Sequence, residues 1–201
     1  RFGLGLGSVA LRRMLRACSR PRRQSLRMNR LKADSSTTAL LRGRGWAVSM
    51  VPWCADGFFV EPVASVGDSF PMVSLGTDRL HLVGEVRGQE AASMLPAVAL
   101  IAALEAASTA TARGRFRILD LCAAPGSKAT LLASNMEERG KGDLLVANEP
   151  DVDRGRVLRT CLLQAGVNNC LVLSLDGRKL GKATPEAFDA VLVDPPCSSE
   201  G

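Results

Sequence analysis

The sequence contains no tyrosine, one histidine and few aromatic residues of any kind, which make up 4% of its 201 residues. Its six cysteines include no CxxC pair, so we expect neither a zinc-finger spacing nor a disulfide scaffold, but reduced thiols and no metal site. The longest charge-free apolar stretch, Met94 to Leu104, has 11 residues, whereas a membrane span needs about 20. These absences predict a soluble, intracellular protein that does not enter a membrane.

Acidic residues are missing from the beginning of the chain. Residues 1–33 hold ten Lys and Arg and no acid, while the other 168 residues hold 16 basic and 20 acidic residues, so this segment accounts for the net charge of +6. Such a segment is typical of an RNA-facing arm, a mitochondrial transit peptide or a solvated tail, and these alternatives stay open. The chain begins at Arg1 without a methionine, so we expect a natural N-terminus further upstream, and we interpret residues 1–24 as a basic leader or tail.

Residues 25–86 have the mixed pattern of a small α+β module. "SLRMNRLKA" predicts a half-buried strand, and "DSSTTALLRGRG" predicts a short capped helix that ends at glycines. "WAVSMVPWCADGFFVEP" predicts strands that are broken by Pro52 and Gly57.

Residues 87–201 have a different pattern, in which helices alternate with apolar strands. Residues 89–107 predict a helix around an interruption at Pro96. "FRILDL", "DLLVAN", "NCLVLSL" and "FDAVLVD" then predict four buried strands, with helical segments after the first two. This alternation predicts an α/β fold with a Rossmann-like parallel sheet, in which the fourth strand lies beside the first. Because the chain stops seven residues after Asp194, we expect a domain truncated after the fourth strand.

The loop "DLCAAPGSKAT" follows the first predicted strand, where open parallel sheets bind their ligands. Its small residues Ala123, Ala124 and Gly126 let a ligand approach the backbone closely. The helix N-terminus at Ser127 and Lys128 attracts a carboxylate or a phosphate. The loop lacks the GxxxxGK[ST] of a P-loop and the GxGxxG of a dinucleotide site, which favours S-adenosylmethionine over these ligands.

A carboxylate follows each of the other three predicted strands. Glu149 ends the second strand 23 residues after Gly126, near the roughly 20-residue spacing of a ribose-binding acid, with a helix-capping role as the alternative. Asp176 ends the third strand, where it either reaches an adenine amino group or forms a turn before a glycine. Asp194 ends the fourth strand, and two prolines hold Cys197 out at the rim of the same site.

These motifs resemble those of the Sun-domain (Fmu/Sun) RNA cytosine-C5 methyltransferases. The resemblance rests on "LDLCAAPGSKAT", "VANEPDVDRGRVL", "FDAVLVDPPCSSEG" and "RGQEAASMLPAV", and it runs from about Ser25 to Gly201. The last of these segments and "VPWCADGFF" look most like the tRNA-methylating branch. The resemblance implies a Rossmann-like methyltransferase domain that uses S-adenosylmethionine, preceded by a small RNA-binding module.

The resemblance also implies roles for individual residues. Glu149 contacts the cofactor's ribose, Asp176 its adenine side, and Asp194 both the cofactor and N3 of the target cytosine. Cys197 assists product release, whereas the attacking cysteine belongs to a downstream Thr-Cys motif that the chain does not contain. The cofactor loop consists of Cys122, Ala123, Ala124, Pro125, Gly126, Ser127 and Lys128.

The sequence departs from the family's motifs at two positions. Ser199 stands where the family has glycine, and Ala129 stands where it has threonine, which affects the expected loop geometry. Cys161, in "RTCLL", is not the attacking cysteine, because it lies inside a predicted helix and is expected in the core. The carboxylate of Asp194 beside Cys197 also disfavours an attacking thiolate there.

The expected function is therefore an S-adenosylmethionine-dependent RNA (cytosine-5) methyltransferase acting on tRNA. Ribosomal RNA as the substrate and a catalytically inactive RNA-binding relative are the alternatives. An amino-group methyltransferase is disfavoured, because Cys197 replaces the aromatic residue that stacks on the target base. We expect a monomer in the nucleus, the cytoplasm or the mitochondrion. If the basic segment faces RNA, the arginines expected to contact phosphates are Arg12, Arg13, Arg22, Arg23 and Arg27.

Overall fold

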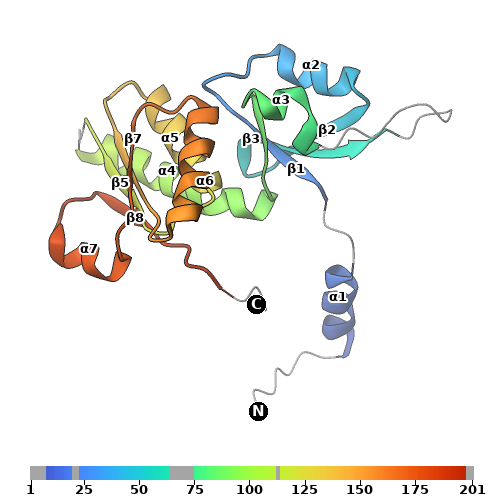
Figure 1. Ribbon diagram of the computed structural model, residues 1–201. Coiled ribbons are helices and arrows are strands. Elements are labelled where there is room, and N and C mark those ends of the chain that lie inside the picture. The colour runs from blue at the N-terminus through green and yellow to red at the C-terminus, as the bar shows by residue number, and fades with distance from the viewer. Residues whose placement is uncertain (1–7, 20–22, 64–74, 112–113, 198–201) are drawn as a thin grey trace.

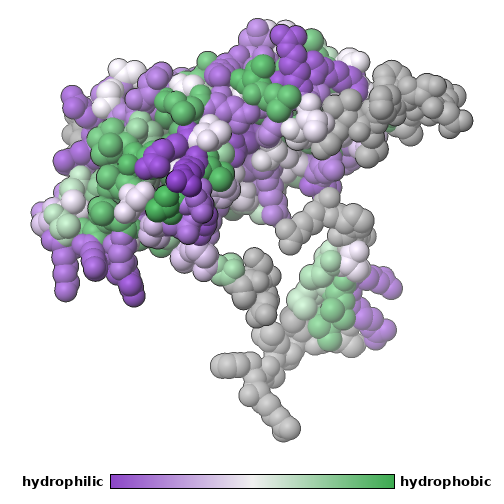
Figure 2. Space-filling model, in the orientation of Figure 1, coloured by the Kyte–Doolittle hydropathy of each residue, from purple (hydrophilic) through white to green (hydrophobic). Residues whose placement is uncertain are grey.

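The computed structural model describes residues 8–19, 23–63, 75–111 and 114–197. Two sheets with their helices form the body of the molecule, and helix α1 (Ser8–Cys18) stands apart from both (Figure 1). Figure 2 shows apolar side chains on one side of α1 and charged ones on the other. The exposed apolar residues of this helix are Val9, Leu11, Met14 and Leu15. The basic N-terminal segment thus contains an amphipathic helix, which the interpretation as a leader or tail did not predict.

The first sheet is antiparallel and has the strand order β2-β3-β1-β4. Its strands are β1 (Ser25–Met28), β2 (Trp46–Val51), β3 (Cys54–Pro62) and β4 (Val86–Gly88). The helices that belong to it are α2 (Ser36–Gly43), a 3-10 turn (Leu75–Thr77) and α3 (Arg79–Leu82). Its core is apolar and consists of Leu26, Leu41, Trp46, Val60, Leu80 and Val86. The predicted α+β module is therefore confirmed.

Gly57 lies inside β3, so the predicted strand break at this residue is wrong. A Cβ atom at this position would lie 2.8 Å from Sδ of Met94 and 3.0 Å from Cβ of Val51. The glycine is therefore needed where the helix after β4 packs closely against the strand, and it does not end the strand.

The helix after β4 is α4 (Ala91–Thr111), and it runs through Pro96 without a break. Pro96 is the sixth residue of α4, so its missing amide removes one helical hydrogen bond, to the carbonyl of Ala92, and the helix continues past it. By length and composition, the 18 residues Ala91–Ser108 are apolar enough to cross a membrane, although core helices of water-soluble proteins pass the same test. In this structure α4 contacts β3, α5 and β8.

The second sheet is parallel, and its strand order is β7-β6-β5-β8. Its strands are β5 (Arg117–Asp120), β6 (Leu144–Asn148), β7 (Cys170–Leu173) and β8 (Ala190–Leu192). The helices between them are α5 (Ser127–Glu138), α6 (Val152–Ala165) and α7 (Gly177–Ala183). The fourth predicted strand pairs with the first, as Leu119 opposite Val191 shows. The predicted Rossmann-like α/β fold is confirmed.

Polar side chains that follow β1 fix the first module to the C-terminal end of α6. Asn29, just after β1, donates from Nδ2 to the carbonyls of Gly84 and Ala165, both at 2.8 Å. Nζ of Lys32 donates to the carbonyls of Val83 and Gln164. The module is therefore held against the parallel sheet by specific, directional contacts.

Candidate active site

The carboxyl ends of the four parallel strands place the predicted site residues at one edge of the sheet. The loop from Cys122 to Lys128 follows β5, Glu149 follows β6, and Asp176 follows β7. Asp194 and Cys197 follow β8, which lies directly beside β5. The structure thus gathers the residues that the sequence separates by 75 positions, as the topology predicts.

The loop after β5 is packed tightly against α6. Gly126 has a φ of 109°, and a Cβ there would lie 3.1 Å from Cβ of Cys161 and 3.2 Å from Cδ1 of Leu158. The carbonyl of Gly126 accepts from the amide of Thr130 at 2.9 Å and from its hydroxyl at 2.8 Å. The first turn of α5 is therefore fixed, and its free amide groups at the N-terminus attract a negative ligand group.

Asn148, at the end of β6, joins three loops of the site. Its Nδ2 donates to the carbonyls of Leu121 and Leu175, and its Oδ1 accepts from the amide of Leu175. Its backbone carbonyl accepts from the amide of Ala123. Asn148 is completely buried, and the sequence reasoning did not single it out. The available signal was one amide side chain at the end of an otherwise apolar strand.

Glu149 lies beside the cofactor loop and is almost completely buried. Its Oε1 accepts from the amide of Asp151 at 3.1 Å, and its Oε2 lies 3.3 Å from Nη2 of Arg154. The same Arg154 nitrogen donates to the carbonyl of Ala124 in the loop. The residue that caps α6 is Asp151, whose side chain accepts from the amide of Arg154. The helix-capping alternative for Glu149 is therefore wrong.

Asp176 caps the N-terminus of α7 by accepting from the amide of Arg178. The Arg178 side chain also donates to both oxygens of this carboxylate. Hydrogen bonds from Arg178 lower the pKa of Asp176 to about 2, so the carboxylate is ionised at neutral pH. Asp176 thus forms a turn at the sheet edge, where the adenine side of a ligand is expected.

Lys128 connects the cofactor loop to the segment after β8. Its Nζ lies 2.5 Å from Oδ2 of Asp194. Asp120, at the end of β5, is 1% exposed, and its Oδ2 has no hydrogen-bond partner among the described residues. Burial raises the pKa of Asp120 to about 6, the charge of Lys128 lowers it, and the charge of Asp194 raises it. The sequence reasoning missed Asp120, although it stands in the quoted loop motif.

Burial and then the negative charges of three carboxylates raise the pKa of the Cys122 thiol. These carboxylates are Asp120, Glu149 and Asp194, which shows that they converge on the loop. Cys122 is therefore a neutral, loop-forming residue at physiological pH rather than a nucleophile.

The structure also places the cysteines and arginines that the sequence analysis named. Cys197 is exposed after the two prolines, and Cys161 is buried in α6, which confirms its predicted place in the core. Arg27 is 2% exposed, so the predicted contact between Arg27 and a phosphate is wrong. Arg23 pairs with Glu61, whereas Arg22 lies outside the described residues.

Comparison with known proteins adds two family models that together match most of the chain. Residues 5–91 match the N-terminal domain of 16S rRNA methyltransferase RsmF, and residues 109–201 match the family described as 16S rRNA methyltransferase RsmB/F. The chain belongs to the RsmB/F family. This finding confirms the resemblance to Sun-domain methyltransferases.

Curated members of the RsmB/F family are similar over nearly the whole chain. Ribosomal RNA small subunit methyltransferase F of Shewanella denitrificans is 43% identical over 186 residues, which are 92% of this chain and 34% of the relative. The protein of the same name from Escherichia coli O1:K1 is 40% identical over 188 residues, 93% of this chain and 36% of the relative. The chain thus spans about a third of the length of these relatives.

Solved structures of similar fold come from Pyrococcus horikoshii. A methyltransferase homologue superposes with a TM-score of 0.75 at 28% identity, covering 96% of this chain and 56% of the other. NSun6 superposes with a TM-score of 0.70 at 16% identity, covering 96% of this chain and 68% of the other, and it supports the fold alone.

The RsmB/F site has the features that S-adenosylmethionine, the cofactor of this methyltransferase family, requires. The N-terminus of α5 at Ser127 and Lys128 suits the cofactor's carboxylate. The unpartnered, buried oxygen of Asp120 suits a cationic group, such as the cofactor's ammonium. Glu149 places a buried carboxylate, a hydrogen-bond acceptor, beside the loop. The carboxylates around the loop would repel the negative charges of a pyrophosphate. This agrees with the absence of a dinucleotide fingerprint from the sequence.

The names and organisms of the curated relatives bear on two of the earlier expectations. They are named for ribosomal RNA, so they favour the rRNA alternative over the tRNA-methylating branch. They are bacterial proteins, which agrees with an intracellular location and gives no support to the nucleus or the mitochondrion.

Proposed function

We propose that this chain forms the cofactor-binding and product-releasing part of an S-adenosylmethionine-dependent RNA (cytosine-5) methyltransferase that acts on small-subunit ribosomal RNA. The observation that carries the proposal is the contact between Lys128 and Asp194, because it joins the cofactor loop to the segment that ends in Cys197. The names of the relatives support ribosomal RNA as the substrate.

The chain's own residues divide the work of binding. We assign the cofactor's carboxylate to the N-terminus of α5, its ribose to Glu149, and its adenine side to Asp176. When bound, S-adenosylmethionine supplies an electrophilic methyl group. Lys128 orients Asp194, whose carboxyl group we assign to N3 of the target cytosine, where charge develops during the reaction.

Product release is the step that we assign to Cys197. In this step C5 of the methylated ring loses its proton, the electron pair restores the C5–C6 double bond, and the bond from C6 to the attacking cysteine's sulfur breaks. Cys197, as a neutral thiol, donates its proton to the departing sulfur and takes up the proton that C5 gives up, so both cysteines end the step as thiols. The exposed position of Cys197 leaves it accessible to a bound RNA base.

The first test concerns the ligand of the loop. Calorimetry on the full-length protein is expected to show binding of S-adenosylhomocysteine and much weaker binding of NAD, because carboxylates surround a loop with one glycine. The variant Glu149→Gln is expected to bind S-adenosylhomocysteine about tenfold more weakly, since it loses a charged acceptor. Tighter binding of NAD than of S-adenosylhomocysteine contradicts the proposal.

The second test concerns the two thiols. The full-length Cys197→Ala variant is expected to form a covalent adduct with small-subunit rRNA and to release it poorly, so a denaturing gel shows RNA retained on the protein. Cys18→Ala is the matched control, because Cys18 is also exposed but lies on α1. It is expected to turn over without an accumulating adduct. Absence of an adduct in Cys197→Ala, with an adduct in the variant of the downstream cysteine, reverses the assignment.

A parallel assay with unmodified tRNA and small-subunit rRNA decides the substrate. Methyl transfer to rRNA, detected as 5-methylcytosine, is expected to exceed transfer to tRNA by at least an order of magnitude. Equal or greater transfer to tRNA restores the expectation derived from the sequence, and no transfer to either RNA indicates the inactive alternative.

A further inference from the structure

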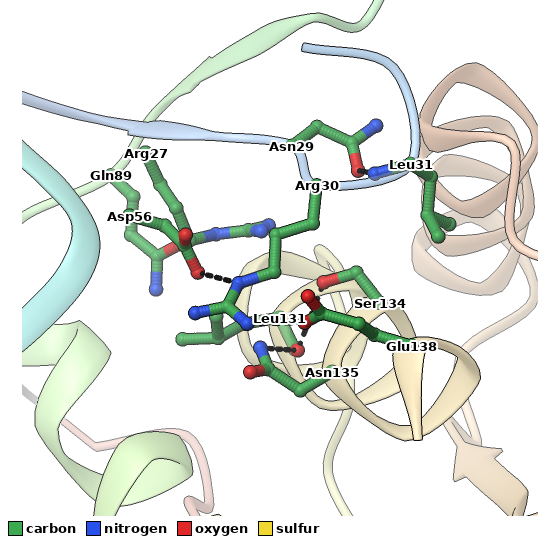
Figure 3. Close-up of polar contacts among 10 residues, drawn as sticks. All are labelled: Arg27, Asn29, Arg30, Leu31, Asp56, Gln89, Leu131, Ser134, Asn135 and Glu138. Carbon is green, nitrogen blue, oxygen red and sulfur yellow. Dashed lines mark hydrogen bonds and ion pairs between the residues drawn. The ribbon is translucent and has the colours of Figure 1, made fainter. Parts of the chain in front are cut away.

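Arg27 extends from the first sheet into the boundary between the two modules. It lies on β1, its side chain is almost completely buried, and its Nε donates to Oε1 of Gln89 at 3.0 Å. Figure 3 shows the Arg27 side chain beside Gln89 and Asp56. Burial lowers the pKa of Arg27 to about 10, and the charge of Asp56 raises it, so the guanidinium stays protonated at neutral pH.

The second contact of Arg27 leads to the cofactor loop. Its Nη2 donates to the hydroxyl oxygen of Thr130 on α5 at 2.7 Å. The same hydroxyl donates to the carbonyl of Gly126 at 2.8 Å, and Gly126 is the left-handed residue at which the loop enters α5. An unbroken, buried chain of two hydrogen bonds therefore runs from β1 to the loop.

A role in docking alone does not account for Arg27. Arg30, three residues later, also reaches α5, but it pairs with Glu138 at the far end of the helix and with Asp56 (Figure 3). Arg30 therefore provides an ion pair between the modules without touching the loop. Arg27 differs because its partner on α5 is one turn from the N-terminus that faces the ligand, and because it is far more deeply buried.

We propose that Arg27 is a positioning residue, which holds the first turn of α5 through the Thr130 hydroxyl and thereby keeps the cofactor loop in its binding conformation. The inference deepens the proposed function and depends on the loop being the cofactor site. It also implies that the N-terminal module contributes to cofactor affinity through the buried hydrogen bond between Arg27 and Thr130, in addition to any contact with RNA.

The test compares four variants of the full-length protein. Arg27→Met removes the guanidinium, Thr130→Val removes the hydroxyl, and Thr130→Ser keeps the hydroxyl. Arg30→Met is the matched control, because it removes a cation from the same boundary but leaves the Thr130 chain intact. The dissociation constant for S-adenosylhomocysteine and hydrogen exchange of the loop amides at 123–130 are measured at a temperature where circular dichroism shows each variant folded.

Arg27→Met and Thr130→Val are each expected to weaken S-adenosylhomocysteine binding about tenfold, the typical effect of losing a hydrogen bond to a charged group. Both are expected to speed exchange of the loop amides, and the double variant is expected to bind no more weakly than Arg27→Met alone. Thr130→Ser and Arg30→Met are expected to match the wild type in both measurements.

Wild-type affinity in Thr130→Val, or an equal loss in Arg30→Met, overturns the positioning role. If Arg27→Met does not fold, Thr130→Val with its Thr130→Ser rescue carries the test. Failure of the wild type to bind S-adenosylhomocysteine refutes the proposed function instead. In that case, faster hydrogen exchange of the loop amides in Thr130→Val, but not in Arg30→Met, still supports the conclusion that Thr130 holds the loop. Unchanged exchange in Thr130→Val contradicts that conclusion.

Discussion

Asp120 has the environment in which a carboxyl group titrates far from its ordinary range. It is buried, and one of its oxygens lacks a partner among the described residues, so its charged form is poorly solvated. The neighbouring Lys128 offsets this only partly, because Lys128 also pairs with Asp194. Folding and the protonation of Asp120 are therefore linked.

The contribution of Asp120 to the free energy of unfolding is expected to fall as the pH rises from about 4 to 6. The folded pKa of Asp120 is raised from 3.8 to about 6, so the folded state holds this proton more tightly than the unfolded state. Asp120→Asn removes the effect, and urea unfolding is expected to show a gain over wild type that grows from near zero at pH 4 to about 2–3 kcal/mol at pH 7.5.

Asp153→Asn serves as the control for this measurement, because Asp153 forms an exposed ion pair with Arg156. Its effect is expected to stay within about 0.5 kcal/mol across the same pH range. A gain in Asp120→Asn that does not change with pH contradicts the assignment of the raised pKa to Asp120.

Residues that follow a sequence motif could be predicted, whereas residues that act through tertiary contacts could not. The loop from Cys122 to Lys128 and the acid Glu149 were found because their spacing along the chain is set by one strand-helix-strand unit. Arg27 was grouped with the surface arginines because its sequence neighbours are basic. Its burial depends on Thr130, which lies 103 residues away, and no local pattern reveals that contact.

At the level of the elements, the N-terminus of α5 depends on a glycine with two separate requirements. Gly126 has a positive φ, and its missing side chain leaves room for Cys161 and Leu158 of α6. Gly140, after the end of α5, also has a positive φ, but no atom lies within 4 Å of its Cβ position. A comparison of variants at the two glycines therefore distinguishes the effect of backbone strain, which both positions have, from the effect of close packing, which only Gly126 has.

Gly126→Ala is expected to weaken S-adenosylhomocysteine binding by more than tenfold in calorimetry, because the loop must shift away from α6. Gly140→Ala is expected to bind like the wild type and to lose only about 1 kcal/mol of unfolding free energy, the usual cost of a side chain at positive φ. Equal binding by the two variants contradicts the view that the packing of the loop sets the affinity.

The longer elements could be predicted from apolar patterns, and the short ones could not. The helices α5 and α6 span enough residues to show their periodicity, and each strand of the parallel sheet stands in an apolar run of six or seven residues. Among these four strands, only β5 and β6 have buried residues, because β7 and β8 are the edge strands, so the expectation of four buried strands is wrong for these two. The strand β4 has three residues, and the helices α3 and α7 have four and seven, so their formation depends on neighbouring elements. Val86 to Gly88 becomes a strand because β1 offers it a free edge.

At the level of the whole molecule, Asn29 is a buried residue that joins the two modules directly. It is buried, its Nδ2 donates to the carbonyls of Gly84 and Ala165, and its Oδ1 accepts from the amide of Leu31. Removing it leaves these groups without a partner in a place that water does not reach freely.

Asn29→Ala is expected to lower the free energy of unfolding by about 2–3 kcal/mol and to separate the unfolding of the modules. Both tryptophans, Trp46 and Trp53, belong to the first module, so their fluorescence reports on it, whereas circular dichroism reports mainly on the longer helices. The two signals are expected to coincide in the wild type and to differ in the variant. Asn168→Ala, an exposed amide with a local contact, is the control and is expected to change little.

The contact between Asn29 and Ala165 also affects how the chain is made. Their 136 residues of separation correspond to roughly 7–27 s of synthesis on the ribosome, so β1 is made long before the end of α6 that it contacts. Arg27 lacks its partner on α5 for most of that interval, since Thr130 is made 103 residues after it. A nascent chain interrupted before residue 165 therefore lacks the contact that fixes β1 to α6, and it leaves the basic side chains around β1 exposed to any RNA nearby.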